Sequence, residues 1–460
     1  MPEFSIDLSA LLAFADDPVA ATWFIVSHGG FIIPLYAFLI MARTLWYNRI
    51  MTRFVVEHLR PVLLAIDVPK LTVQTAKGVE NLLSHLAGAH GSPNRREKYI
   101  TGFVQEWFAL EIVSIEGYIQ FLVWTWDKYR DLVETVIYAQ YPDAQISEVE
   151  DYTTAVPDHY PNAEWNLFGV EFVPVKPDAY PLRTWEQFEH KGQKDEAFKD
   201  PLAAMLENMA RIGPGEQIWL QILLRPISQD WQKRSEALVK KLIGAKMPVK
   251  KNAIDTVTGI VGAVVTPVIN EVLGSESFEA AAPKREDPPS KILYLSPGER
   301  NVVELIEKKA AKLGFETKIR TIYVGRHEVF KKPRGAHAVI GAMKQFNSND
   351  ANALKPEFKS VGPSSLFWFK ERRNNARRTR LMRAYRSRNM WIGVKPYILN
   401  IEELATIWHF PTVAVHTPLV SRTVSKRAEP PTGLPTSAMP TIAQSSSAGK
   451  LEPPAGLPVV

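Results

Sequence analysis

Residues 107–125 read WFALEIVSIEGYIQFLVWT, and this stretch decides the fold. It consists of two runs in which branched and aromatic side chains recur with the alternation typical of a β-strand. The runs meet near Glu116 and Gly117, where a polar residue followed by glycine is typical of the tight turn of a hairpin. We therefore predict an antiparallel β-hairpin within an α+β fold.

The hairpin lies inside a regular series of predicted elements. An apolar run at 62–67 predicts a strand, and the apolar spacing of 74–89 predicts a helix. After the hairpin, residues 127–141 predict a second helix and 144–152 a closing strand. The order β-α-β-β-α-β is that of a ferredoxin-like unit, an antiparallel sheet with two helices on one face. We assign residues 47–155 to this first unit.

A second, less regular series follows on both sides of a segment rich in Pro, Gly and Ala. The expected strands are 164–175, 216–227, 316–325 and 391–400, and the expected helices are 200–213, 229–244, 296–315, 336–346 and 401–410. The economical interpretation is a second ferredoxin-like α+β unit, assembled from residues 156–245 and 292–412. Residues 246–291 form the predicted linker, although their apolar part would also suit a membrane surface or a groove. Residues 413–460, rich in Pro and Ser without an apolar period, predict a disordered tail.

The helix expected at 296–315 carries a full set of boundary signals. Ser296 is a suitable N-cap, Pro297 fits the first helical position and Glu299 completes a capping box. Gly314 is predicted to end the helix in the left-handed conformation. Similar start and stop residues, Asp200 and Gly213, bound the first helix expected in the second unit.

An uncharged stretch near the N-terminus predicts a membrane anchor. Residues 23–42 carry no formal charge and are as long as the ~20 residues that cross a hydrocarbon core. Trp46 and Tyr47 follow the stretch, where aromatic rings favour the headgroup zone. The charges that follow it are all basic as far as residue 53: Arg43, Arg49 and Arg53. We predict a single transmembrane helix at 20–46, with residues 1–19 outside and the rest of the chain in the cytoplasm; a buried core helix is the alternative.

The motifs of common catalytic sites are missing. The chain contains no cysteine, which excludes disulfides, thiolate metal sites and cysteine nucleophiles. It also lacks the phosphate-binding GxxxxGK[ST] loop, GxSxG, HExxH and the dinucleotide glycine fingerprint. We expect no enzymatic activity, no cofactor and no metal site.

The charge of the chain is concentrated in residues 370–388, KERRNNARRTRLMRAYRSR. This segment holds nine Lys or Arg residues and one Glu, and so carries +8 in a chain whose formal charge is only +6. Arginine prevails, which favours bidentate binding of phosphate or carboxylate. Nucleic acid, anionic lipid, an acidic protein surface and plain solvation all remain open as explanations. The candidate binding residues are Lys370, Arg372, Arg373, Arg377, Arg378, Arg380, Arg383, Arg386 and Arg388.

Several strings, taken in order, resemble a known bacterial family. They are VLLAIDVPK, AKGVENLLSHLAGAHG, FALEIVSIEGYIQFLVWT, YRDLVETVIYAQYPDAQISEVEDY, DPLAAMLENMARIGPGEQIWLQILLRP, LYLSPGERNVVELIEKKAAKLGF and MWIGVKPYILNIEELATIWHFP. The resemblance covers roughly residues 20–435. The family consists of single-pass membrane proteins associated with, and sometimes fused to, conjugative coupling-protein ATPases of type IV secretion systems.

The resemblance implies a setting for the chain. No Walker motif follows Pro411, so any ATPase is expected to be a separate polypeptide. The implied function is a membrane-anchored, non-catalytic accessory or scaffold subunit that docks this motor and contacts DNA. The alternative is a membrane-tethered nucleic-acid-binding protein independent of any motor. The expected partners are a separate P-loop motor ATPase of the coupling-protein type, DNA, the membrane and, in a homo-oligomer, further copies of the chain.

Overall fold

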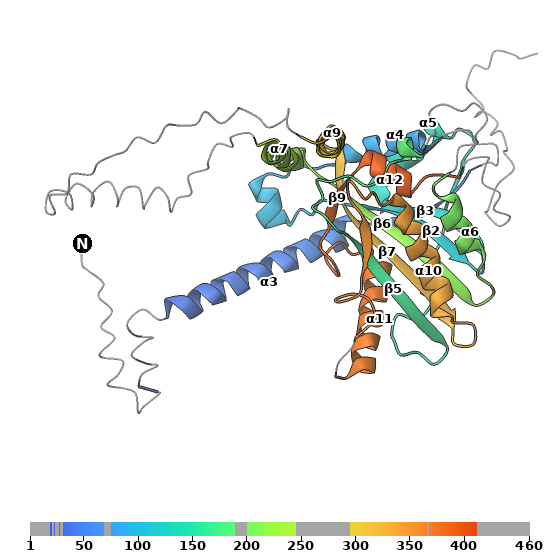
Figure 1. The fold of residues 1–460 in the computed structure, drawn as a ribbon. Helices are drawn as coiled ribbons and strands as arrows, with labels where there is room; N and C mark the ends of the chain where they lie inside the picture. The colour runs from blue at the N-terminus through green and yellow to red at the C-terminus, as the bar shows by residue number, and fades with distance from the viewer. Residues whose placement is uncertain are drawn as a thin grey trace, which may run out of the picture. The chain divides into compact units, whose positions relative to one another are not determined.

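The fold is known from a computed structural model. The structure describes residues 19, 20, 23, 27, 31–68, 75–188, 200–244, 295–365 and 368–411. The predicted linker at 246–291 and the predicted tail at 413–460 lie outside these residues. Within the described residues, a nine-stranded antiparallel sheet forms the centre of the protein (Figure 1).

The strands follow the apolar runs of the sequence. They are β1 (Pro61–Asp67), β2 (Phe108–Ile115), β3 (Tyr118–Trp126), β4 (Gln145–Glu148), β5 (Trp165–Pro174), β6 (Glu216–Pro226), β7 (Gly314–Arg326), β8 (Leu354–Glu357) and β9 (Tyr397–Asn400). Their order in the sheet is β4-β1-β3-β2-β6-β7-β5-β8, and β9 pairs with β7. The short strand β8 was not predicted, because its Lys-Pro-Glu sequence lacks the apolar alternation of a strand.

The predicted hairpin is confirmed. Ile115 of β2 pairs with Tyr118 of β3, which leaves Glu116 and Gly117 as the two turn residues. Both have positive φ, 54° and 94°, as a two-residue hairpin turn of type I′ requires. The carboxylate of Glu116 accepts a hydrogen bond from the backbone N–H of Gly215 at 3.0 Å, which ties the turn to the neighbouring strand connection.

The two expected series of elements share one sheet. The first contributes the strands β4-β1-β3-β2 and the second contributes β6-β7-β5-β8. They meet where β2 pairs antiparallel with β6, in a register that runs from Phe108 opposite Leu224 to Ile115 opposite Gln217. A single β-ladder therefore joins the two halves of the chain.

Helices cover both faces of the sheet (Figure 1). The helices are α3 (Ile32–His58), α4 (Ala76–Ala87), α5 (Arg130–Gln140), α6 (Ala203–Ala210), α7 (Asp230–Leu242), α9 (Pro297–Ala310), α10 (Lys332–Met343), α11 (Lys370–Arg386) and α12 (Ile401–Ile407). Strand β2 shows how the sheet separates two cores. Phe108, Leu110 and Ile112 pack with residues of α4, α5, α6, α10 and α12 on the first face. Ala109 and Val113 point to the second face, which α11 and the C-terminal part of α3 cover.

Some predicted boundaries were wrong. The capping box of Ser296 and Glu299 is present, but Gly314 does not end the helix, because α9 stops at Ala310 and Gly314 is the first residue of β7. Helix α6 begins only at Ala203 and ends at Ala210, ahead of the predicted stop. The strand expected at 391–400 is shorter than predicted, because residues 391–396 form a loop and only Tyr397–Asn400 pair with β7.

Helix α3 covers the second half of the predicted membrane span. Its uncharged residues 32–42 are followed by a part that carries Arg43, Arg49, Arg53 and Glu57 and ends at His58. Residues 21, 22, 24–26 and 28–30 of the predicted span lie outside the described part of the chain. In that described part, no helix has both the length and the apolar character needed to cross a membrane.

Candidate functional site

Helix α11 forms from the basic segment and lies on the second face of the sheet. Leu381, Met382 and Tyr385 are buried against the strands, which fixes the side of the helix that faces the body. The approach is close at Gly169 of β5, since a Cβ atom there would lie 2.6 Å from Cδ2 of Leu381. The packing therefore sets which of the nine basic side chains reach solvent.

The structure divides these nine side chains into groups with different roles. Arg388 is 2% exposed and belongs to the interior. Arg377 and Arg386 are half-buried and donate hydrogen bonds to backbone carbonyls, of Gly362 and Val156 among others. These three arginines hold the fold and are not free to bind a partner.

Two further arginines have neighbours at the surface. Nη1 of Arg378 donates to Asn375 at 2.7 Å, and burial lowers the pKa of this guanidinium. Arg383 lies beside His159 and within 3.9 Å of the Asp158 carboxylate. The remaining four are exposed, and among the described residues none of them has a side-chain partner: Lys370, Arg372, Arg373 and Arg380.

Arg388 is the cation of a buried cluster. Its guanidinium donates to both carboxylate oxygens of Glu111, at 3.1 and 3.2 Å, and also pairs with Asp151. Burial alone would lower the pKa of Arg388, but the two carboxylates outweigh it and raise the pKa well above the ordinary value. Tyr152 and Tyr385 complete the cluster, since their hydroxyls lie 2.9 Å apart and Tyr152 donates to Glu111.

Glu111 begins a row of polar side chains across four central strands. The register places Glu111 of β2 opposite Gln221 of β6, Gln221 opposite Arg320 of β7, and Arg320 opposite Glu171 of β5. Gln221 donates to Glu111 at 2.8 Å, and Arg320 donates to Glu171. All four side chains are completely buried. Sequence reasoning missed the row, although each of the four apolar strands carries at least one polar residue at a position that points to the second face.

The loop after α11 is fastened to the same row. Arg320 donates to the carbonyls of Asn389 and Ile392, each at 2.6 Å. Lys318 donates to the carbonyl of Ile392 at 2.9 Å, and burial lowers its pKa to about 8. Gly393, with φ of 100°, lies against the Glu171 carboxylate, where a Cβ atom would overlap it. The polar row thus holds α11 and the loop after it against the sheet.

A small cavity lies beside the polar row, next to α11. It has a volume of about 50 Å³ and is lined by Glu171, Arg377, Arg380 and Gly393, among others. A space of this size holds one or two water molecules and is far smaller than the several hundred Å³ of ordinary ligand pockets. Water molecules in the cavity can hydrate the carboxylate of Glu171, but the cavity is too small to enclose a substrate.

The N-terminal end of α11 carries two exposed aromatic residues. Trp368 is 84% exposed and Phe369 74%, directly ahead of Lys370. Together with Arg372 and Arg373 they bring rings and cations to one end of the helix. The sequence reading did not single out Trp368 and Phe369, although exposed rings among arginines are a known signal of nucleic-acid contact.

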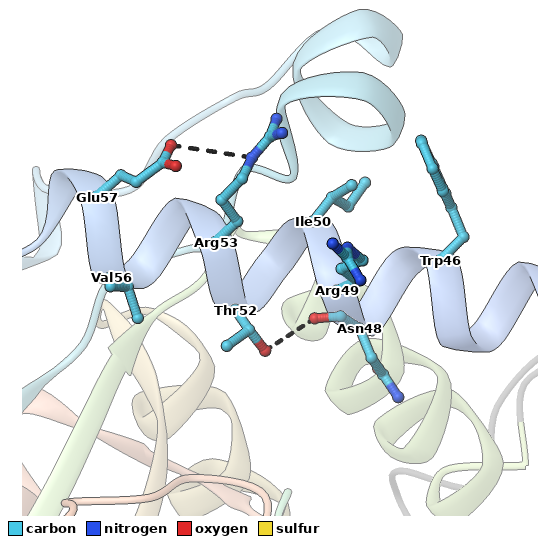
Figure 2. Close-up of a pocket in the computed structure, with 8 residues that line it drawn as sticks. All are labelled: Trp46, Asn48, Arg49, Ile50, Thr52, Arg53, Val56 and Glu57. Carbon is cyan, nitrogen blue, oxygen red and sulfur yellow. Dashed lines mark hydrogen bonds and ion pairs between the residues drawn. The ribbon is translucent and has the colours of Figure 1, made fainter.

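A second surface feature lies on α3. An open hollow of about 600 Å³ runs along the helix, and Figure 2 shows its lining residues. Arg53 and Glu57 project from one side of α3 and are 3.8 Å apart, whereas Thr52 and Val56 project from the other side. Trp46 stands at the end nearest the apolar part of the helix. This hollow is large enough for a small organic group.

Metal ligation was not expected from the sequence. Over the described ranges, no group of three or more His, Asp or Glu side chains is arranged to hold a metal ion. The residues that converge in the interior are paired with one another instead.

Comparison with known proteins gives one family. No curated protein matches the chain. Residues 103–423, more than half of the sequence, match the model of a domain of unknown function, DUF8128. This match takes in β2 to β9, the buried polar row and helix α11. The chain therefore belongs to the DUF8128 family.

Proposed function

We propose that this protein is a membrane-anchored, non-catalytic subunit that binds nucleic acid through the exposed end of α11. The observation that carries the proposal is the split among the basic residues. Lys370, Arg372, Arg373 and Arg380 are exposed and unpaired within the described residues, and the first three directly follow Trp368 and Phe369. Solvation alone would not require two large aromatic rings in water next to these cations.

The other basic residues of this segment fix α11 rigidly to the body of the protein. Arg377 and Arg386 are bonded to backbone carbonyls, and Arg388 is locked to Glu111. A binding surface on a fixed helix loses less conformational entropy on association than one on a mobile arm. The buried arginines thus support the exposed ones.

The chemistry of the surface favours single-stranded nucleic acid. Guanidinium groups bind phosphates in a bidentate manner. Exposed rings stack on unpaired bases, which contributes about 1–3 kcal/mol per base and does not depend on sequence. Trp368 and Phe369 offer two such rings at the N-terminal end of the basic helix.

Membrane anchorage is supported by the side chains of α3. Its large apolar residues in the first half are about half exposed or more: Ile32, Leu35, Tyr36, Phe38, Leu39, Ile40, Met41, Leu45 and Trp46. A helix that is apolar on all sides needs an apolar environment. We propose that α3, with the residues that precede it, anchors the chain, with the body in the cytoplasm.

The setting of the function rests on the resemblance to proteins associated with conjugative coupling-protein ATPases. We propose that the chain is an accessory or scaffold subunit of a type IV secretion or conjugation-like machine, with the motor ATPase as a separate partner. The strand orders β4-β1-β3-β2 and β8-β5-β7-β6 support two ferredoxin-like units as its scaffold, since each is the order of an antiparallel β-α-β-β-α-β unit.

A binding assay on the full chain in mild detergent tests the nucleic-acid function. The natural chain is compared with R372Q/R373Q/R380Q, and with K331Q/K344Q/K355Q as a control that removes three exposed cations elsewhere. We expect the first variant to bind a labelled single-stranded oligonucleotide at least about tenfold more weakly, and the control to bind as the natural chain does. Equal affinity of all three proteins would reject nucleic acid as the ligand of α11.

Affinity purification from native membranes, followed by mass spectrometry, tests the partner. A stoichiometric protein with a Walker motif is the expected result. Recovery of nucleic acid without such a protein would instead favour a membrane-tethered nucleic-acid-binding protein that works without a motor.

A further inference from the structure

A short π-helix, η2 (Glu97–Thr101), lies directly against α3. Gly102, which follows η2 with φ of 79°, packs on the backbone of α3, and a Cβ atom there would lie 2.6 Å from the carbonyl oxygen of Ile50. The rings of Tyr47 and Tyr99 are 6.4 Å apart. A segment some 50 positions later in the chain is thereby fixed beside α3, at the point where its apolar part ends.

This contact brings together basic residues from both segments. Those of α3 are Arg43, Arg49 and Arg53, and those of the second segment are Arg95, Arg96 and Lys98. All six side chains are exposed. In the described part of the chain, Arg53 is the single member with an ion-pair partner, Glu57 at 3.8 Å. The other five leave their charge open to a ligand.

Apolar and aromatic side chains stand beside these cations. Trp46, Tyr99 and Ile100 are 61%, 54% and 62% exposed. Along α3 the uncharged residues 32–42 are therefore followed by a stretch in which cations and aromatic rings are interleaved: Arg43, Trp46, Tyr47, Arg49 and Arg53. The same order is found where a protein crosses from the hydrocarbon core through the interface to the headgroups.

We propose that the six cations, with Trp46, Tyr99 and Ile100, form a collar that binds anionic lipid headgroups. The inference rests on the proposed membrane anchorage, and it adds that the anchored protein prefers lipids with anionic headgroups. Two observations favour lipid over nucleic acid here: Ile100 would stay in water on a nucleic acid, and the collar adjoins the exposed apolar half of α3. The hollow along α3 between Trp46 and Glu57 gives a headgroup room beside Arg49 and Arg53 (Figure 2).

Native mass spectrometry of the full chain in mild detergent tests the collar. Phosphatidylglycerol and phosphatidylcholine are supplied in equal amounts, and the lipids retained per chain are counted. We expect the natural chain to prefer phosphatidylglycerol, and R95Q/R96Q/K98Q to retain at least about fivefold less of it. The control K331Q/K344Q/K355Q and the charge-preserving variant R95K/R96K/K98R should keep the preference.

Three results would overturn the collar: equal retention of both lipids by the natural chain, an unchanged preference in the Gln variant, or loss of the preference in the control as well. A separate experiment judges the anchor. The natural chain, reconstituted into vesicles of phosphatidylcholine alone, should float with them in high salt, because an apolar anchor needs no anionic lipid. Failure to float would overturn the anchorage, whereas loss of headgroup preference with normal flotation overturns the collar alone.

Discussion

Arg388 donates a hydrogen bond from Nε to Oε1 of Glu111 at 3.1 Å, across 277 positions of sequence. The bond joins Arg388, the second residue beyond the end of α11, to strand β2, and neither side chain is more than 2% exposed. An isolated charge at either position would be costly to bury, so each residue requires the other. The pair fixes the helix that carries the proposed binding surface onto the shared sheet.

Removal of Arg388 should strongly destabilise the protein. In R388M the carboxylate of Glu111 stays buried without its cation, which costs about 3–5 kcal/mol of unfolding free energy. Urea denaturation measures the loss. R380M, at an exposed position on the same helix, should lie within about 0.5 kcal/mol of the natural chain. The double variant E111Q/R388M should recover part of the stability, and strictly additive effects of the two changes would contradict the pairing.

A methyl group at position 393 should also be poorly tolerated. Gly393 has φ of 100° and lies against Glu171, so alanine brings both backbone strain and overlap with a buried carboxylate. We expect G393A to lose at least about 1–3 kcal/mol in thermal or urea unfolding. Gly341 in α10 is the matched control, since nothing lies within 4 Å of a Cβ atom there. G341A should be neutral or stabilising by up to about 1 kcal/mol, and equal effects of the two changes would refute the explanation.

Lys318 should make stability depend on pH in the alkaline range. Burial lowers its pKa from 10.5 to about 8. Between these two values the unfolded chain binds more protons than the folded chain, so the free energy of unfolding rises with pH through this window. The rise is isolated by comparison with K318M, because other groups titrate alike in both proteins. The natural chain should gain stability relative to K318M from pH 8 to 10; a constant difference would show that Lys318 does not titrate there.

The salt dependence of nucleic-acid affinity should increase with the number of exposed cations on α11 that contact phosphates. Each phosphate contact with a single strand adds about 0.7 to the slope of log affinity against log salt concentration. The variant R372Q/R373Q/R380Q should therefore show a slope smaller by about 2. W368A, which keeps every charge, should weaken binding by about 1–3 kcal/mol without a change in slope. If W368A and the arginine variant changed the slope alike, the division into stacking and phosphate contacts would be wrong.

Much of the secondary structure follows from local sequence. The hairpin at Glu116–Gly117 is encoded by alternation and turn chemistry, which act over a few residues. The capping box of Ser296 and Glu299 is equally local. The prediction that Gly314 ends a helix was wrong because Gly314 of β7 pairs with Asn400 of β9. This contact joins positions far apart in the chain, which local sequence does not reveal.

The candidate site was predicted only as a region. Composition placed a basic helix at 370–388, and α11 occupies 370–386. Charge alone cannot separate Arg388, buried beside Glu111, from Arg372, which is exposed. That separation depends on which side of the helix packs on the sheet. The same packing leaves the rings of Trp368 and Phe369 exposed to solvent, and only this exposure makes them candidate binding residues.

The sequence by itself determined most of the elements, their order and the place of the charge, because periodicity, caps and turns act within a few residues. Tertiary structure decided what those elements do. The register between β2 and β6 joined two halves into one sheet and aligned Glu111, Gln221, Arg320 and Glu171 in a row. Burial of this row requires partners for its charges, and the chain supplies Arg388 and the loop after α11. The physical reason is the cost of an unpaired charge away from water, which no local pattern reveals.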